Sequence, residues 1–196
     1  MLLKGVITIS VPYVAENLRP WEEFAKSVGC EARLIRTIDI AGTSRDDLAI
    51  VKEPPTREVS AFEDFLSLTR RVADRFTGAQ SSLKFLFPCH LHRAVLYSEA
   101  RISFLLKPHH AVEIEGVCKK NGVLAQRDLP LRAKMPSGME RWTFIGQSLE
   151  GENTFEKETR ITLAYTDLAS SAVGIFRGGS IPDKTVYRII KDSAYE

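Results

Sequence analysis

Histidines are the residues of this chain whose type and spacing could most readily do chemistry. All four lie in one short region, at His90, His92, His109 and His110. If residues 90–92 form a strand, the side chains of His90 and His92 point to the same face, because successive side chains alternate. Imidazoles paired in this way are common ligands of a metal ion. The pair predicts a metal site, and the competing interpretation is two polar side chains at the end of a strand.

The pair at His90 and His92 resembles the first motif of cupin barrels, and residues 136–138 (Pro-Ser-Gly) are similar to the turn of their second motif. The resemblance implies a small β-barrel enzyme or ligand-binding protein with a metal on the two histidines. Two positions depart from it. Cupins place a glutamate three or four residues after the pair, whereas the first acid here is Glu99, and Arg141 stands where the second motif has a histidine.

Other catalytic patterns are absent from the sequence. Cys89 precedes His90, but neighbouring residues of a strand face opposite sides, so their spacing does not make a catalytic pair. The chain has no Gly-x-Ser-x-Gly elbow, no P-loop and no Gly-x-Gly-x-x-Gly fingerprint. We therefore predict no catalytic residues and no cofactor other than the metal considered above, and we favour a protein that is not an enzyme.

Basic residues are candidates for contact with a membrane or a nucleic acid, since such groups bind acidic lipid headgroups or phosphates. Two lysines would occupy the tip of a protruding turn, whereas the arginines of residues 70–75 could equally serve only to keep the outer face of a helix soluble. The candidate contacts are Arg70, Arg71, Arg75, Lys84, Lys119, Lys120, Arg132 and Lys134.

The element that would position these groups is clearest in residues 60–87. Ser60 and Glu63 have the spacing of a capping box, and apolar residues follow at helical intervals. Gly78 stands where a left-handed C-cap is expected. An apolar run then ends at Pro88, which is typical of a strand. We predict one long helix over about 60–77 that folds back onto a sheet.

The N-terminal part predicts further elements of the same sheet. Residues 3–11 are rich in Val and Ile and predict a strand, residues 18–29 predict a short helix ended by Gly29, and residues 30–40 alternate like a half-buried strand. Residues 41–58 contain paired acids and paired prolines, and we predict a flexible loop or linker there.

The C-terminal half shows strand signals every eight to fifteen residues and almost no helix. Asn121-Gly122 is typical of a two-residue hairpin turn, and no internal repeat is visible. The predicted strands cover residues 94–106, 110–117, 123–131, 142–145, 159–165, 172–176 and 186–190. Residues 1–196 therefore predict a single α+β domain: a mainly antiparallel sheet or open barrel, packed by one long helix (60–77) and a short N-terminal helix.

Composition sets wider limits. The chain has 196 residues, 44% of them hydrophobic, and a net charge of +2, which does not indicate a dedicated nucleic-acid binder. No apolar run is long enough for a transmembrane helix, and the apolar start is expected to be a strand and not a signal peptide. Cys30, Cys89 and Cys118 are widely spaced and odd in number, which favours a reducing, cytoplasmic location, either free or peripheral to a membrane.

Two stretches resemble the compact domain of matrix proteins from negative-strand RNA viruses, the rhabdovirus type in particular. One is the helix-to-strand unit at 62–87, and the other is the predicted strand-turn-strand segment at 142–167, which ends in Asp167. The resemblance implies self-association under a membrane and contact with a nucleocapsid, without catalysis. Those proteins usually begin with a basic, proline-rich tail carrying Pro-Pro-x-Tyr, whereas residues 11–13 here have a single proline before the tyrosine.

Our leading prediction is a non-enzymatic structural or interaction protein, a viral matrix-like or coat-like subunit. It would form homo-oligomers and contact an anionic membrane surface or RNA through basic loops. One alternative is a small metal-dependent β-barrel enzyme or ligand-binding protein that uses His90 and His92. The other is an RNA-binding module.

Overall fold

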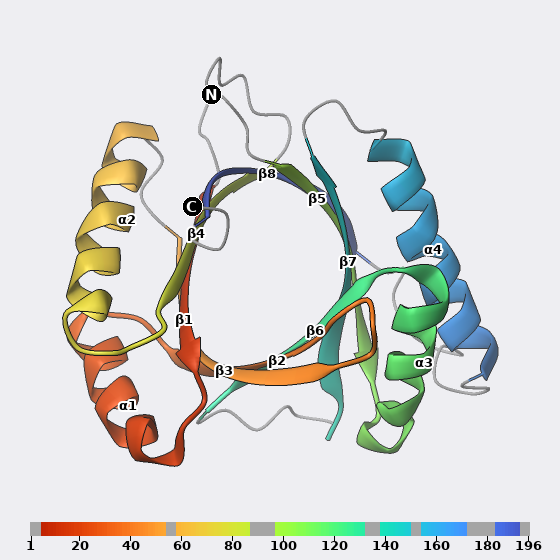
Figure 1. Cartoon of the computed structure of the whole chain (residues 1–196), viewed down its shortest axis with the longest axis horizontal. Coiled ribbons are helices and arrows are strands. Elements are labelled where there is room, and N and C mark those ends of the chain that lie inside the picture. Colours follow the sequence, from red (N-terminus) through yellow and green to blue (C-terminus); the bar gives the residue numbers. More distant parts are fainter. Residues whose placement is uncertain are drawn as a thin grey trace.

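Eight strands among the described residues pair antiparallel and close into a barrel (Figure 1). The structure, a computed structural model, describes residues 5–53, 58–86, 97–131, 138–149, 154–171 and 183–192. Around the barrel the strands follow the order β1-β3-β2-β6-β7-β5-β8-β4. Their bounds are β1 (Gly5–Pro12), β2 (Ala32–Ile38), β3 (Ser44–Lys52), β4 (Gln80–Leu86), β5 (Tyr97–Leu106), β6 (Leu124–Pro130), β7 (Glu140–Leu149) and β8 (Asp183–Asp192).

The chain repeats one order of elements, β-α-β-β-α-β, in its two halves. The first half places its strands in the order β4-β1-β3-β2, and the second half places the equivalent strands as β8-β5-β7-β6. Ladders between β2 and β6 and between β4 and β8 join the halves. The helices are α1 (Leu18–Ser27), α2 (Glu58–Ala73), α3 (Val112–Asn121) and α4 (Thr154–Ser171), with short 3-10 helices η1 (Ala15–Asn17) and η2 (Pro108–His110).

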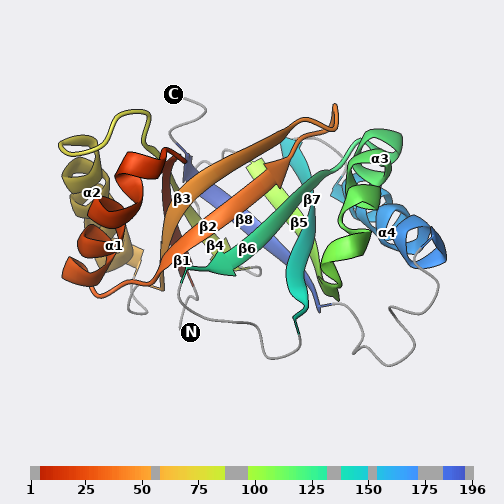
Figure 2. The same cartoon turned by 90° about the horizontal axis from the view of Figure 1, so that it is seen from below.

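The hydrophobic cores lie outside the barrel wall, beneath the helices. Helices α1 and α2 cover one side of the barrel, and α3 and α4 cover the opposite side, as both views show (Figures 1 and 2). Trp21 and Phe65 are buried in the first core, and Trp142 and Phe144 in the second. Each such side chain contributes about 1.5–3 kcal/mol of burial free energy. Because side chains alternate along a strand, the residues between these apolar positions face the interior of the barrel.

The predicted fold class is confirmed: the protein is α+β, built on an antiparallel sheet. The short N-terminal helix is α1, the long helix is α2, and the strands predicted over 3–11 and 30–40 are β1 and β2. Two details differ. The sheet closes into a barrel instead of remaining open, and α2 begins at Glu58, so Ser60 lies within the helix instead of capping it.

The prediction of a loop over 41–58 is wrong for Ser44–Lys52, which forms β3. This strand pairs with β1 on one side and β2 on the other, and its Leu48 and Ile50 enter the first core. The paired acids that suggested a loop are compatible with a strand because each has a cationic partner. Asp46 accepts two hydrogen bonds from Arg36, and Asp47 accepts one from Arg45.

The C-terminal half is richer in helix than predicted. Residues 110–117 and 159–165, predicted as strands, belong to η2 and α3 and to α4. The buried residues of α3 and α4 are spaced three and four apart, as in a helix, and both sets enter the second core. These residues are Ile114, Val117 and Cys118 in α3, and Ile161, Ala164 and Leu168 in α4. The predicted strand at 186–190 lies within β8, and the one at 172–176 lies outside the described residues.

Candidate functional site

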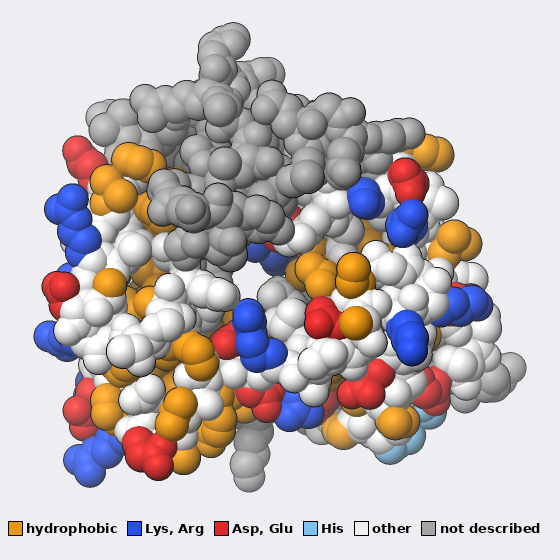
Figure 3. All heavy atoms as spheres, in the orientation of Figure 1, with side chains coloured by type: hydrophobic (Ala, Val, Ile, Leu, Met, Phe, Trp, Pro, Cys, Tyr) orange, Lys and Arg blue, Asp and Glu red, His pale blue; other side chains and the backbone are white. Residues whose placement is uncertain are grey.

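A cavity of about 280 Å³ lies inside the barrel and is lined by residues from each of the strands β1 to β7. Figure 3, which looks along the barrel, shows the hollow between the described surfaces. Apart from Ile35 and Leu124, every described lining residue is polar or charged. The lumen is therefore the polar counterpart of the two apolar cores outside the wall.

Strand register sets these polar residues in rows across the lumen. Thr37 of β2 lies opposite Arg45 of β3 on one side and opposite Gln126 of β6 on the other. On the facing wall, Thr8 of β1 lies opposite Ser82 of β4, and Ser10 lies opposite Gln80. Directly opposite residues share one face of a sheet, so each row presents its side chains to the same space.

A buried ion cluster forms one end of this lining. Lys84 Nζ of β4 lies 3.0 Å from Glu99 Oε1 of β5, and Arg101 Nη2 lies 2.7 Å from Glu99 Oε2. Strand β8 separates β4 from β5 in the sheet, so the contact of Lys84 with Glu99 spans it. Burial alone would raise the pKa of Glu99, but the charges of Arg101 and Lys84 together lower it to about 2. Glu99 is thus an ionised structural anchor at neutral pH and not a proton donor.

A second ion pair lines another part of the cavity. Arg45 Nε lies 2.9 Å from Asp47 Oδ2, and Arg45 Nη2 donates a hydrogen bond to Gln80 Oε1 at 3.2 Å. The side chain of Asp47 is 7% exposed. Burial raises its pKa, and Arg45 opposes that rise only in part. Among the described residues, the side-chain hydrogen bond to Asp47 goes to Oδ2, from Arg45.

Several lumen groups lack a hydrogen-bond partner within the described part of the chain. They include the hydroxyls of Thr8, Ser10 and Ser82, all on β1 and β4. Gln126 donates to Thr37 Oγ1 at 3.4 Å, while its own carbonyl oxygen accepts nothing from the described residues. A bound molecule or water can satisfy these groups, because they border open space.

The structure moves one predicted surface residue into the lumen. The sequence predicts Lys84 as a basic contact for lipid or nucleic acid. Its side chain is only 12% exposed and pairs with Glu99. The reason is strand alternation: Leu83 enters the first core, so the next residue along β4 faces the interior of the barrel.

The remaining basic candidates do not form one surface. Arg70, Arg71 and Arg75 are exposed at the end of α2 and just beyond it, and the last two lie 5.7 and 5.6 Å from the ring of Phe24. Lys119 and Lys120 are exposed in the last turn of α3, not at a hairpin tip, and Lys120 pairs with Asp167. Helices α2 and α3 lie on opposite sides of the barrel (Figure 1). Arg132 and Lys134 lie outside the described residues.

The predicted metal site on His90 and His92 also lies outside the described residues. The other two histidines lie in η2, where His110 Nδ1 is 3.3 Å from Glu113 Oε1. Within the described ranges, no group of three or more His, Cys, Asp or Glu side chains is arranged to hold a metal ion.

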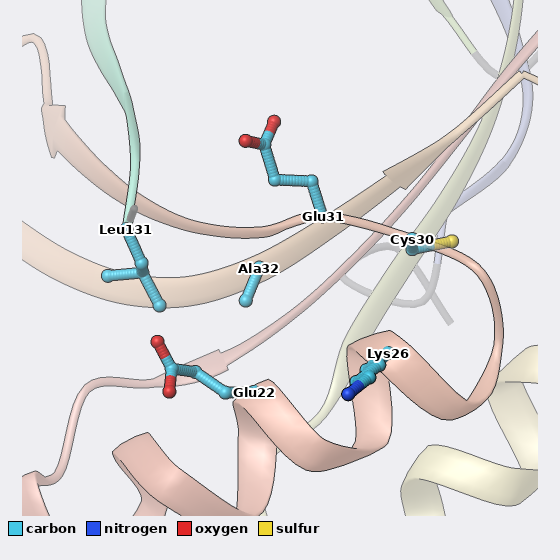
Figure 4. A pocket seen from close by; sticks show the side chains of 6 residues that line it. All are labelled: Glu22, Lys26, Cys30, Glu31, Ala32 and Leu131. Carbon is cyan, nitrogen blue, oxygen red and sulfur yellow. The ribbon is translucent and has the colours of Figure 1, made fainter. Parts of the chain in front are cut away.

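A smaller cavity, of about 200 Å³, lies beside α1 and the start of β2 and includes Cys30 (Figure 4). The thiol points away from the carboxylates of Glu22 and Glu31. Burial raises the pKa of Cys30, although Lys52 lowers it in part. In the second core, burial raises the pKa of Cys118 to about 12. Both thiols are protonated at neutral pH, which is unsuited to nucleophilic chemistry.

Sequence reasoning missed the residues that make the lumen polar, above all Asp47, Glu99 and the glutamines. The signal that could have identified them is a polar residue at every second position between buried apolar ones. In β1, Thr8 and Ser10 follow this pattern between Ile7, Ile9 and Val11. The sequence cannot show which strands share a lumen, and that is what brings these residues together.

Comparisons with known proteins leave the chain without a family. No protein-family model matches it, and no curated protein does. A "Putative monooxygenase" from Fusobacterium nucleatum subsp. nucleatum is 7% identical over 97% of this chain and 94% of its own, with a TM-score of 0.32. An unknown protein from Galdieria sulphuraria is 11% identical, with coverages of 95% and 99% and a TM-score of 0.27. A "putative glycine cleavage system transcriptional repressor" is 12% identical, with coverages of 95% and 98% and a TM-score of 0.25. Similarity this low supports no inference about function.

None of the described helices combines the length and the apolar character needed to cross a membrane.

Proposed function

We propose that this protein binds a small polar molecule in the lumen of its barrel. The observation that carries the proposal is the cavity of about 280 Å³, lined by polar side chains from seven strands. Eight-stranded barrels are just wide enough either to be filled by their own side chains or to hold one small ligand. Here the inward side chains leave space and direct hydrogen-bonding groups into it.

A polar lumen is costly for a protein that needs only stability. Buried polar groups without partners cost about 1–3 kcal/mol each, and apolar side chains would fill the same space favourably. Ser82 and Asp47 are almost fully buried and line the cavity, and Asp47 is paired there with Arg45. Polar side chains at these positions are understandable if a bound molecule forms further hydrogen bonds with them. The cavity lies near the lower end of the size range of ligand pockets, which is about 300–1,000 Å³.

The proposal develops the ligand-binding alternative and does not depend on a metal at His90 and His92. The matrix-like and RNA-binding interpretations stay predictions. Both require basic side chains on one continuous surface. The described candidates lie on α2 or just after it (Arg70, Arg71 and Arg75) and on α3 (Lys119 and Lys120), and these two helices lie on opposite sides of the barrel (Figure 1). Concentration-dependent light scattering and salt-sensitive binding to anionic liposomes or RNA would test them.

A lumen-blocking variant tests the proposal. Wild-type protein is screened against a mixture of small polar metabolites by saturation-transfer NMR. Ser82→Phe places a ring in the lumen, and Ser67→Phe, at an exposed position of α2, is the matched control. We expect metabolites bound by wild type and Ser67→Phe to be lost from Ser82→Phe, while circular dichroism shows that both variants are folded. Equal binding by all three proteins, or binding by none of them, would refute lumen binding.

A further inference from the structure

The chain contains three glutamines, and all three line the lumen. Gln80 lies on β4, Gln126 on β6 and Gln147 on β7. A glutamine amide is uncharged and offers two donors and one acceptor oxygen. The residue type best suited to bind neutral polar groups is thus concentrated in this cavity.

The charged residues of the described lining are already paired. Arg45 contacts Asp47 at 2.9 Å and Lys84 contacts Glu99 at 3.0 Å, and Arg101, which also contacts Glu99 at 2.7 Å, adds one further cation to this cluster. An ionic ligand would have to compete with these contacts or leave its own charge desolvated beside them, and both are costly. A neutral ligand meets neither obstacle.

The unused hydrogen-bonding groups of the described lining include both donors and acceptors. Gln80 accepts from Arg45 through its oxygen, and its amide nitrogen donates to no described residue. Gln126 donates to Thr37, and its oxygen accepts from no described residue. The hydroxyls of Thr8, opposite Ser82, and of Ser10, opposite Gln80, can act in either role. A matching ligand must itself carry donors and acceptors.

From these observations, and resting on the proposed function, we infer that the lumen selects a small uncharged molecule that carries both hydrogen-bond donors and acceptors, such as a polyol or a carboxamide. Gln80 and Gln126 contact it directly from opposite halves of the chain. The paired charges of Arg45, Asp47, Lys84 and Glu99 remain in place and discriminate against ions.

The same glutamines provide the readout. Protein labelled with ¹⁵N at glutamine and tryptophan side chains gives amide signals from the lumen alone, and the indole N–H groups of Trp21 and Trp142 report on the two outer cores. Four probes are titrated: myo-inositol, nicotinamide, inorganic phosphate and putrescine. We expect saturable shifts of the glutamine amides with at least one neutral probe, none with the two ions, and no change at the indoles. Gln126→Ala should weaken that binding about fivefold, as the loss of one hydrogen bond predicts.

The outcomes separate the inference from the proposal on which it rests. Saturable glutamine shifts with phosphate or putrescine would overturn the neutral ligand class and leave lumen binding intact. If neither neutral probe shifts the glutamine amide signals, the inferred ligand class is also wrong. The comparison of Ser82→Phe with Ser67→Phe would then still decide whether the lumen binds a ligand. Shifts that Gln126→Ala does not weaken would refute direct contact by that residue.

Discussion

The buried carboxylate of Glu99 holds two cations inside the barrel, and its loss should be costly. Replacing it by Gln removes the carboxylate that Lys84 and Arg101 both contact, and the side chains of these two residues are only 12% and 22% exposed. Breaking a buried ion pair by removing one partner costs about 3–5 kcal/mol. We expect Glu99→Gln to lower the free energy of unfolding by about 3 kcal/mol in urea titrations at pH 7. Glu23→Gln is the matched control, since Glu23 and its partner Arg19 are mostly exposed and their pair contributes less than about 1 kcal/mol.

The same carboxylate predicts an acid-labile part of the stability. The pKa of Glu99 is about 2 in the folded protein, below its ordinary value of 4.5, in spite of burial and because of Arg101 and Lys84. A lowered pKa stabilises the fold above the unfolded-state pKa, and this stabilisation is lost as the pH falls from about 4.5 towards 2. Unfolding titrations across this range should show a smaller acid loss for Glu99→Gln than for wild type. If the free energy of unfolding falls equally with pH in both proteins, Glu99 does not have a lowered pKa.

Asp47 should behave in the opposite way, because burial raises its pKa above the ordinary value of 3.8 and Arg45 opposes that rise only in part. A carboxyl with a raised pKa stabilises the fold below its unfolded-state pKa, and this contribution is lost as the pH rises through the folded-state value. We therefore expect Asp47→Asn to be more stable than wild type at pH 7 and equal to it near pH 3, measured by urea unfolding. Lower stability of the variant at pH 7 would show that the pair with Arg45 outweighs the cost of burial.

At the scale of elements, Gly122 shows how a local signal can be assigned to the wrong structure. Asn121-Gly122 predicted a hairpin, but Gly122 (φ +62°) ends α3 in the left-handed conformation. Both structures require a glycine with positive φ, so the dipeptide alone cannot distinguish them. Gly122→Ala should lower the free energy of unfolding by about 1–2 kcal/mol, the cost of a left-handed conformation for a residue with a Cβ.

A second glycine of the same helix provides the control for that prediction. Gly116 lies exposed within α3, and a Cβ added there would contact nothing within 4 Å. Gly116→Ala should therefore stabilise the protein by up to about 1 kcal/mol through helix propensity. The thermal unfolding temperature should fall for Gly122→Ala and rise for Gly116→Ala. A shift in the same direction would contradict either the helix or its C-cap.

Elements were predicted correctly where the residue pattern fits only one secondary structure. They were predicted wrongly where the pattern fits both a helix and a strand. The helix over 60–77 has a long apolar stripe that fits no strand, and α2 is found there. Residues 110–117 can be read as alternating, but Ile114, Val117 and Cys118 also fit a helix, and packing beneath α4 decides in favour of the helix. For the lumen, the sequence supplied Lys84 as a cation but not its partner, because Glu99 is fifteen residues away and β8 lies between their strands.

At the scale of the whole molecule, the repeat of β-α-β-β-α-β is visible in the structure and not in the sequence. The two halves preserve element order and strand pairing while their side chains differ. Fold symmetry of this kind needs only apolar residues at matching outward positions, and many residue types satisfy that requirement. The inward positions are free to diverge, and in this chain they carry the polar groups of the lumen.

This architecture predicts that the two halves unfold as one unit. Each half alone would leave two strand edges unpaired, which the ladders β2–β6 and β4–β8 cover. Arg33 and Asp128, 2.6 Å apart, add an ion pair across one junction. The first core contains Trp21 and the second contains Trp142, so fluorotryptophan labelling gives one ¹⁹F signal for each half. We expect both signals to show the same urea midpoint, and Gly122→Ala, a change in the second half only, to lower both midpoints equally. A midpoint that shifts for Trp142 alone would show that the halves are independent domains.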